Sequence, residues 1–177
     1  MKKLILMAAL LAAPQTPGKY VLDRPVNYRE WIFVGSSLGL SYAPGASAMP
    51  EMYHNVYIKP EAYREFVKTG KFPEGTMLAM EMTTADTKKD PALRGSFESE
   101  FLGLEVAVKD SRRFDGGWGY FSFSDRGSNY KDKAEPFPAS AGCVDCHKQH
   151  AATDNVFTQF YPVLRAVQKE RASGGRS

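Results

Sequence analysis

The sequence has little net charge for its length. The formal charge at pH 7 is only +3, and Lys2 and Lys3 supply two of these charges, which leaves +1 for the rest of the chain. Nucleic-acid binding requires a basic face, so the composition gives no electrostatic reason to expect a nucleic-acid partner. The sequence also lacks internal repeats and long low-complexity runs.

Long apolar runs are equally scarce. Only the N-terminus has one, and residues 4–13 are too short to cross a bilayer comfortably. Two lysines, an apolar run and small residues at its end are typical of a secretory signal peptide. We expect residues 1–13 to be that signal, with cleavage near Ala12 or Ala13 and an uncleaved anchor as the alternative. The mature protein would then be periplasmic, or exposed on the outer face of the cytoplasmic membrane.

Removal of this signal would leave about 160 residues, which suits one domain with its own core. We expect an N-terminal extension over residues 14–26, a single haem-binding domain over residues 27–170, and a flexible basic tail over residues 171–177.

Cysteine is rare as well, and both cysteines fall in one motif. Cys143, Cys146 and His147 form C-x-x-C-H, the attachment sequence of a c-type haem. The two thiols can add to the vinyl groups on one edge of the porphyrin, and the imidazole can bind the iron from the proximal side. The sequence therefore predicts one covalently attached haem c.

Two other interpretations of the motif are weaker. A redox-active cysteine pair would not need His147, and such a pair normally opens a helix after a strand. Structural zinc needs four nitrogen or sulfur ligands, and only His54 and His150 remain as nitrogen donors.

The middle of the chain has the alternating pattern of half-buried strands. Residues 101–109 place apolar side chains on one face, residues 118–123 are aromatic-rich after a glycine turn, and residues 76–82 follow another turn. The apolar residues of the first strand are Leu102, Leu104, Val106 and Val108. In the strand expected over residues 76–82, Leu78, Met80 and Met82 share one face. The fold class is thus predominantly β (α+β) with an antiparallel sheet. We expect the aromatic group of Trp118, Tyr120, Phe121 and Phe123 in the core and at a dimer contact.

Helices are expected at two places. Pro60 can open a helix that ends near Thr69, with Gly70 as its C-terminal stop. A second helix follows the haem motif, with Asp154 as the candidate N-cap and Pro162 forcing a kink or a restart. Its apolar stripe either covers part of the porphyrin or is plain core: Phe157, Phe160, Tyr161 and Leu164.

This pattern excludes two common single-haem designs. A small electron-transfer cytochrome c has its motif near the start and is mostly helical. A four-helix cytochrome c′ has the motif near its end but needs four long amphipathic helices.

The residues resemble the cytochrome P-460 family over about 28–164. The similar stretches are residues 54–58, 62–63, 69–77, 143–147 and 154–162. That family includes cytochromes P-460, which oxidise hydroxylamine, and cytochromes c′-beta, which bind small gases. The resemblance implies an antiparallel β fold, a homodimer and a five-coordinate haem with His147 as the proximal ligand.

The resemblance also indicates which residue separates the cytochromes P-460 from the cytochromes c′-beta. Cytochromes P-460 carry a lysine bonded to the porphyrin on the strand that follows the Pro-x-Gly-Thr turn, and residues 76–82 contain no lysine. Met80 or Met82 would face the haem there. This departure favours the cytochrome c′-beta branch, in which apolar side chains cap the distal face, and Tyr53 is the candidate for that cap.

Three functions remain open at this point. The first is a periplasmic protein that binds NO or CO at an open, apolar distal site, since neutral diatomics need no hydrogen-bond donor. The second is an oxidoreductase acting on hydroxylamine or a related small nitrogen compound. The third is an electron carrier with a methionine as sixth ligand and a periplasmic redox partner, although strand methionines more often fill the core.

Overall fold

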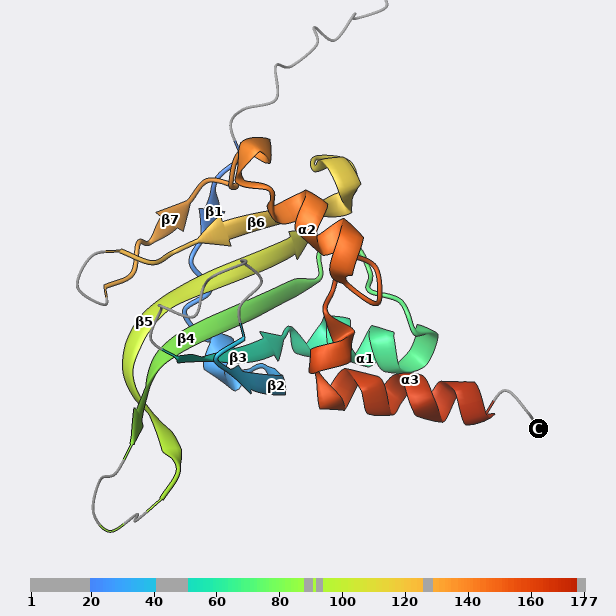
Figure 1. The fold of residues 1–177 in the computed structure, drawn as a ribbon. Helices are drawn as coiled ribbons and strands as arrows, with labels where there is room; N and C mark the ends of the chain where they lie inside the picture. The colour runs from blue at the N-terminus through green and yellow to red at the C-terminus, as the bar shows by residue number, and fades with distance from the viewer. Residues whose placement is uncertain (1–19, 41–50, 88–90, 92–93, 126–128, 175–177) are drawn as a thin grey trace, which may run out of the picture.

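The fold is built on one twisted antiparallel sheet. The computed structural model describes residues 20–40, 51–87, 91, 94–125 and 129–174. Within them the large sheet has the order β2-β3-β4-β5-β6, and Figure 1 shows β4 and β5 as its long, curved centre. The bounds are β2 (Ile32–Leu38), β3 (Met52–Ile58), β4 (Met77–Thr87), β5 (Ser96–Lys109) and β6 (Trp118–Ser122). The predicted α+β class with antiparallel strands is confirmed.

A short second sheet brings the N-terminal segment into the fold. β1 (Leu22–Asp23) pairs antiparallel with β7 (Lys133–Ala134), and Leu22 is buried. The ring of Tyr20 packs against Phe114 and Phe121 at centroid distances of 5.5 and 5.6 Å. The expected extension over residues 14–26 stays a prediction, and its described part from residue 20 onward packs against the domain. Residues 14–19 and the expected signal peptide 1–13 lie outside the described residues.

The first predicted helix is confirmed at both ends. α1 (Pro60–Thr69) begins at its proline and ends where Gly70 adopts a left-handed φ of 73°. The Gly70 N–H donates to the Phe66 carbonyl at 2.7 Å, which closes the last turn of the helix.

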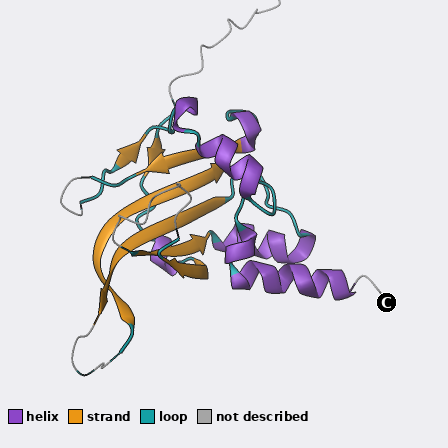
Figure 2. Cartoon of the chain, in the orientation of Figure 1, coloured by secondary structure: helices purple, strands orange, loops and turns teal. Residues whose placement is uncertain are grey.

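Two more helices follow the strands. α2 (Cys143–His150) contains the C-x-x-C-H motif, and α3 (Pro162–Gly174) lies beside α1 (Figure 2). α3 continues to Gly174, so residues 171–174 of the expected tail 171–177 are helical, and residues 175–177 lie outside the described part. No helix in the described ranges is long and apolar enough to span a bilayer.

The segment between α2 and α3 differs from the prediction. Asp154 does not cap a helix. It has a φ of 46°, its neighbour Asn155 has a φ of 58°, and Thr153 and Val156 form an antiparallel bridge around them. Two consecutive residues with positive φ are typical of a type I′ turn, and Asp and Asn tolerate this conformation better than most residues. Pro162 restarts the chain as the first residue of α3, one of the two predicted outcomes.

The alternation along β5 is largely confirmed. Leu104, Val106 and Val108 are buried on one face, as expected. Leu102 is 37% exposed because it is the extra residue where the pairing with β4 shifts between Met82 and Thr83. Such a β-bulge interrupts the alternation of faces. The four aromatic residues of 118–123 are also buried in the core, and their expected part in a dimer contact stays a prediction.

One close contact joins the sheet to the start of α3. A Cβ atom at Gly35 of β2 would lie 2.8 Å from Pro162 Cδ and 3.1 Å from the Phe160 carbonyl oxygen. Only glycine lets the two backbones approach this closely. β2 is therefore packed directly against the start of α3 and the residues just before it.

Candidate functional site

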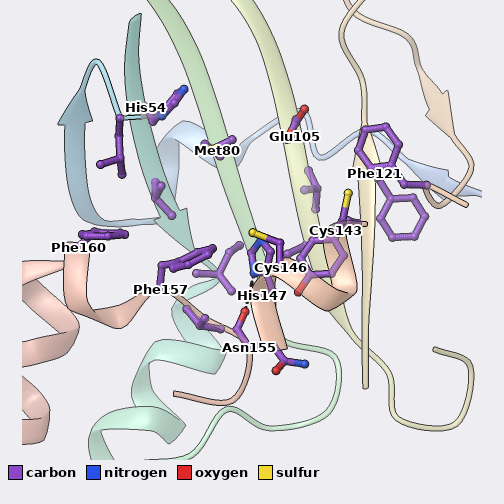
Figure 3. A pocket seen from close by; sticks show the side chains of 18 of the residues that line it. His54, Met80, Glu105, Phe121, Cys143, Cys146, His147, Asn155, Phe157 and Phe160 are labelled. Atoms are coloured by element: carbon purple, nitrogen blue, oxygen red, sulfur yellow. Dashed lines mark hydrogen bonds between the residues drawn. The ribbon is translucent and has the colours of Figure 1, made fainter. Parts of the chain in front are cut away.

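The sheet and the C-terminal segments line a half-open cavity of about 530 Å³. This lies in the usual range of roughly 300–1,000 Å³ for small-molecule and cofactor sites. Its strand side consists mainly of Val56, Leu78, Met80, Met82, Glu105 and Ala107, with His54 at its edge. Its other side comes from later in the chain, chiefly Tyr120, Cys143, Cys146, His147, Phe157 and Phe160 (Figure 3).

His147 is oriented by a backbone carbonyl. Its Nδ1 lies 2.7 Å from the carbonyl oxygen of Asn155. A carbonyl oxygen can only accept, so Nδ1 carries the proton and Nε2 is left with a lone pair for a metal. Burial lowers the pKa of His147 despite this hydrogen bond, which favours the neutral imidazole that metal binding requires.

Two aromatic rings hold the plane of the imidazole. The Tyr120 ring lies 4.4 Å from the His147 ring between centroids, and the Phe157 ring lies 4.6 Å away in an edge contact. Phe157 is 5% exposed. The apolar stripe after the motif thus reaches the cavity through Phe157, Phe160 and Tyr161, whereas Leu164 is plain core.

Both thiols line the same cavity. Cys143 and Cys146 are half-buried, unpaired, and lie one helical turn apart on α2 beside His147. Burial raises the pKa of the Cys143 thiol, and the nearby carboxyl of Glu105 raises it further. His150, at the end of α2, is exposed and is not part of the cavity lining.

On the strand side, three residues of β4 face the cavity together. Leu78, Met80 and Met82 all line it, as their shared face predicted. Glu81 points the other way, where it is 4% exposed and accepts hydrogen bonds from Tyr28 and from Arg29 at 2.8 Å. This carboxylate stabilises the back of the sheet and has no contact with the site.

The expected cap, Tyr53, lies away from the cavity. It is not among the lining residues, and its hydroxyl donates to the Ser96 carbonyl at 3.0 Å. Successive strand residues face opposite sides, so His54 and Val56 of the same strand point into the cavity instead. The assignment of Tyr53 to the distal pocket is therefore corrected, and His54 lies at that edge.

The cavity is less apolar than the sequence led us to expect. Glu105 and His54 line it, and burial raises the pKa of Glu105 and lowers the pKa of His54. Both shifts favour the neutral forms, because burial penalises the charged forms. Glu105 was not predicted as a site residue because the alternation of β5 suggested only that it faces away from the buried Leu104 and Val106.

Tyr120 supplies a further polar atom. Its side chain lines the cavity, the residue is 9% exposed, and its hydroxyl has no hydrogen-bond partner within the described residues. A buried polar group without a partner costs about 1–3 kcal/mol. Two thiols, an imidazole with a free Nε2, apolar walls and this hydroxyl all fit a haem that fills the cavity and offers polar edge groups.

These features fit a class of β-rich haem proteins in which the haem-attachment motif follows the sheet in sequence. The chain belongs to the Cytochrome P460 family, whose profile matches residues 25–158. The predicted family is thereby confirmed, and membership implies a haem cofactor. No curated protein matches the chain.

Proposed function

We propose that the protein is an exported cytochrome with one covalently attached haem c, which binds small neutral gases such as NO and CO at an open iron site. The observation behind this proposal is the arrangement of one cavity. Cys143, Cys146 and the Asn155-bound His147 lie on one side of it, and a mainly apolar strand surface lies on the other. Thioether bonds from the two thiols would fix the porphyrin edge against α2.

A bound haem would supply an iron ion with a coordination position that accepts neutral diatomic ligands. The lining residues determine which ligands can reach that position. None of the described lining residues is lysine or arginine, so an anion gains no ion pair there. Leu78, Met80 and Met82 crowd the strand side and favour small ligands.

Glu105 adds a selective contact. Burial raises the pKa of Glu105, which favours the protonated carboxyl relative to an exposed glutamate. A protonated carboxyl can donate a hydrogen bond to a bound ligand without adding negative charge to the cavity.

The same carboxyl supports a second candidate function, oxidation of hydroxylamine or a related small nitrogen compound. Such a reaction releases protons, and a partly buried glutamate can accept and relay them. The absence of a lysine from β4 argues against it, because the similar hydroxylamine-oxidising proteins bond that lysine to the porphyrin.

Optical spectra of the purified ferrous protein, with and without CO, test the proposal. A high-spin spectrum that shifts with CO supports an open site. A sharp low-spin spectrum that CO does not change would contradict it and would support an electron carrier with a methionine ligand. Hydroxylamine turnover with an artificial electron acceptor would support the second candidate.

The proposal also includes a homodimer and a periplasmic redox partner. Sedimentation of the purified holoprotein measures the first directly. A monomer at all accessible concentrations would remove the homodimer from the proposal without affecting the haem site.

A further inference from the structure

We propose that Asp154 is a positioning residue for the proximal ligand, and that its ion pair with Lys109 tunes the imidazole of His147 through the carbonyl of Asn155. The inference rests on the proposed function, because it requires His147 to bind the haem iron. Its starting point is the turn over residues 153–156, which supplies the hydrogen-bond acceptor of His147.

The turn has an unfavourable backbone conformation at Asp154 and at Asn155, whose carbonyl accepts the hydrogen bond from His147. Asp154 and Asn155 both have positive φ, at 46° and 58°. Residues other than glycine adopt such conformations at a cost in free energy, so they persist only where surrounding contacts hold them. Here the bridge between Thr153 and Val156 closes the turn with a hydrogen bond of 2.8 Å, from the Val156 N–H to the Thr153 carbonyl.

Side-chain contacts tie this turn to the sheet. Lys109 Nζ donates to Asp154 Oδ2 at 2.6 Å, and Trp118 Nε1 lies 3.4 Å from Asp154 Oδ1. Lys109 and Trp118 are cross-strand partners on β5 and β6, so they form one rigid support. Lys109 also donates to the Phe72 carbonyl at 2.7 Å.

The ion pair is better protected than an ordinary surface pair. The Lys109 side chain is 16% exposed and that of Asp154 is 38% exposed. Because Lys109 is largely desolvated, salt screens this pair less than it screens pairs in open water.

A second contact fixes Asn155 itself. Its side-chain amide donates to the Gly116 carbonyl at 2.9 Å, while its own carbonyl accepts from His147 at 2.7 Å. The Tyr120 and Phe157 rings hold the plane of the imidazole, but they accept no proton from Nδ1. The strength of the Nδ1 hydrogen bond is thus determined by the turn.

This hydrogen bond has an electronic consequence. A strong acceptor at Nδ1 makes the imidazole a better electron donor at Nε2, which strengthens the iron–nitrogen bond and favours ferric iron. Loss of the Asp154 contacts should let the Asn155 carbonyl move away. The iron–histidine bond should then weaken, and the reduction potential should rise.

The test uses Asp154→Asn and Lys109→Met in the full-length holoprotein. Asparagine still tolerates positive φ, so the first variant removes charge and keeps the turn. Both variants should lower the iron–histidine stretching frequency in the resonance Raman spectrum of the ferrous protein. Each should favour the reduced state about tenfold, which is roughly 59 mV for a one-electron couple.

Three further variants make the result specific. Lys109→Arg keeps the charge and should restore the wild-type frequency. Asp23→Asn breaks the exposed ion pair between Asp23 and Lys133, at 3.0 Å in the small sheet, and should change neither readout. The double variant of Asp154 and Lys109 should shift no further than either single variant, since both act through one pair.

Failure of this inference can be told apart from failure of the proposed function. Haem content and CO binding are measured first, and a wild-type protein without bound haem would overturn both. Haem-loaded variants with the wild-type frequency and potential would overturn only the role of Asp154. If Asp154→Asn does not fold, the comparison of Lys109→Met with Lys109→Arg decides the outcome by itself.

Discussion

Met80 of β4 and Glu105 of β5 are direct partners across two antiparallel strands, and both side chains line the cavity. Side chains at such positions start about 4.5–5.5 Å apart at Cβ. A flexible apolar side chain and a carboxyl group are therefore adjacent on the strand side of the cavity. Their contributions to ligand binding can be separated by substituting each residue in turn.

The first prediction concerns the methionines. If Met80 and Met82 only fill space beside an open iron, Met80→Leu and Met82→Leu should both leave the ferrous haem high-spin and five-coordinate. Leucine has a similar volume and usually costs less than about 1.5 kcal/mol in a core. Absorption spectra of wild type and both variants check this. A low-spin wild type that turns high-spin in one variant would identify that methionine as a sixth ligand.

A second prediction follows from the raised pKa of Glu105. The folded state binds this proton more tightly than the unfolded state does, whose pKa is near the ordinary value of 4.5. The stabilisation is therefore fully present below pH 4.5 and is lost as the pH rises through the folded-state pKa. The free energy of unfolding of wild type should fall over this interval relative to that of Glu105→Gln.

Urea unfolding at a series of pH values measures this difference. Glu61→Gln is the matched control, because Glu61 lies on α1 with an exposed side chain and its variant should follow wild type. Parallel curves for wild type and Glu105→Gln would mean that the Glu105 carboxyl is ionised in the cavity.

The third prediction concerns attachment. Cys143 and Cys146 should both form thioethers, so acidified acetone should extract no haem from the intact protein. His147→Ala should remove the axial ligand and greatly lower the yield of mature holoprotein, because the imidazole supplies an iron–nitrogen bond. Free extraction of haem from wild type would refute covalent attachment.

The fourth prediction concerns the porphyrin itself. β4 contains no lysine, and none of the described lining residues is a lysine. The intact mass should therefore equal the processed chain plus one haem. Peptide mapping should find only the two cysteines joined to the porphyrin, and hydroxylamine oxidation should be negligible. A lysine–porphyrin peptide would instead favour the hydroxylamine-oxidising function.

Local signals predicted several elements because their causes are local. Pro60 and Gly70 define α1 through the backbone geometry of single residues. The alternation of Leu104, Val106 and Val108 identified a buried strand face in the same way. The haem motif was recognisable because its three functional residues are neighbours in sequence.

The assignment of Tyr53 was wrong because strand pairing is not a local property. His54 is opposite Met82 and Val56 is opposite Met80, so these residues share the cavity face, whereas Tyr53 is opposite Thr83. A shift of one residue in this register would have turned Tyr53 inward. The sequence contains the alternation, but it does not state which of the two sets faces the cavity.

The conformation at Asp154 could not be predicted from the sequence for a different reason. Aspartate is favoured both at helix N-caps and in left-handed turn positions. The choice depended on contacts with Lys109 and Trp118, which are distant in sequence.

The contact between Gly35 and Pro162 bears on the order in which the protein matures. At this distance α3 packs on β2, while α2, whose two thiols line the cavity, packs on β6. Phe160 and Tyr161, which directly precede α3, line the same cavity, so the docking of α3 completes its wall. We therefore expect the attachment machinery to act on an incompletely folded chain, and docking of α3 to be the step that seals the finished cytochrome.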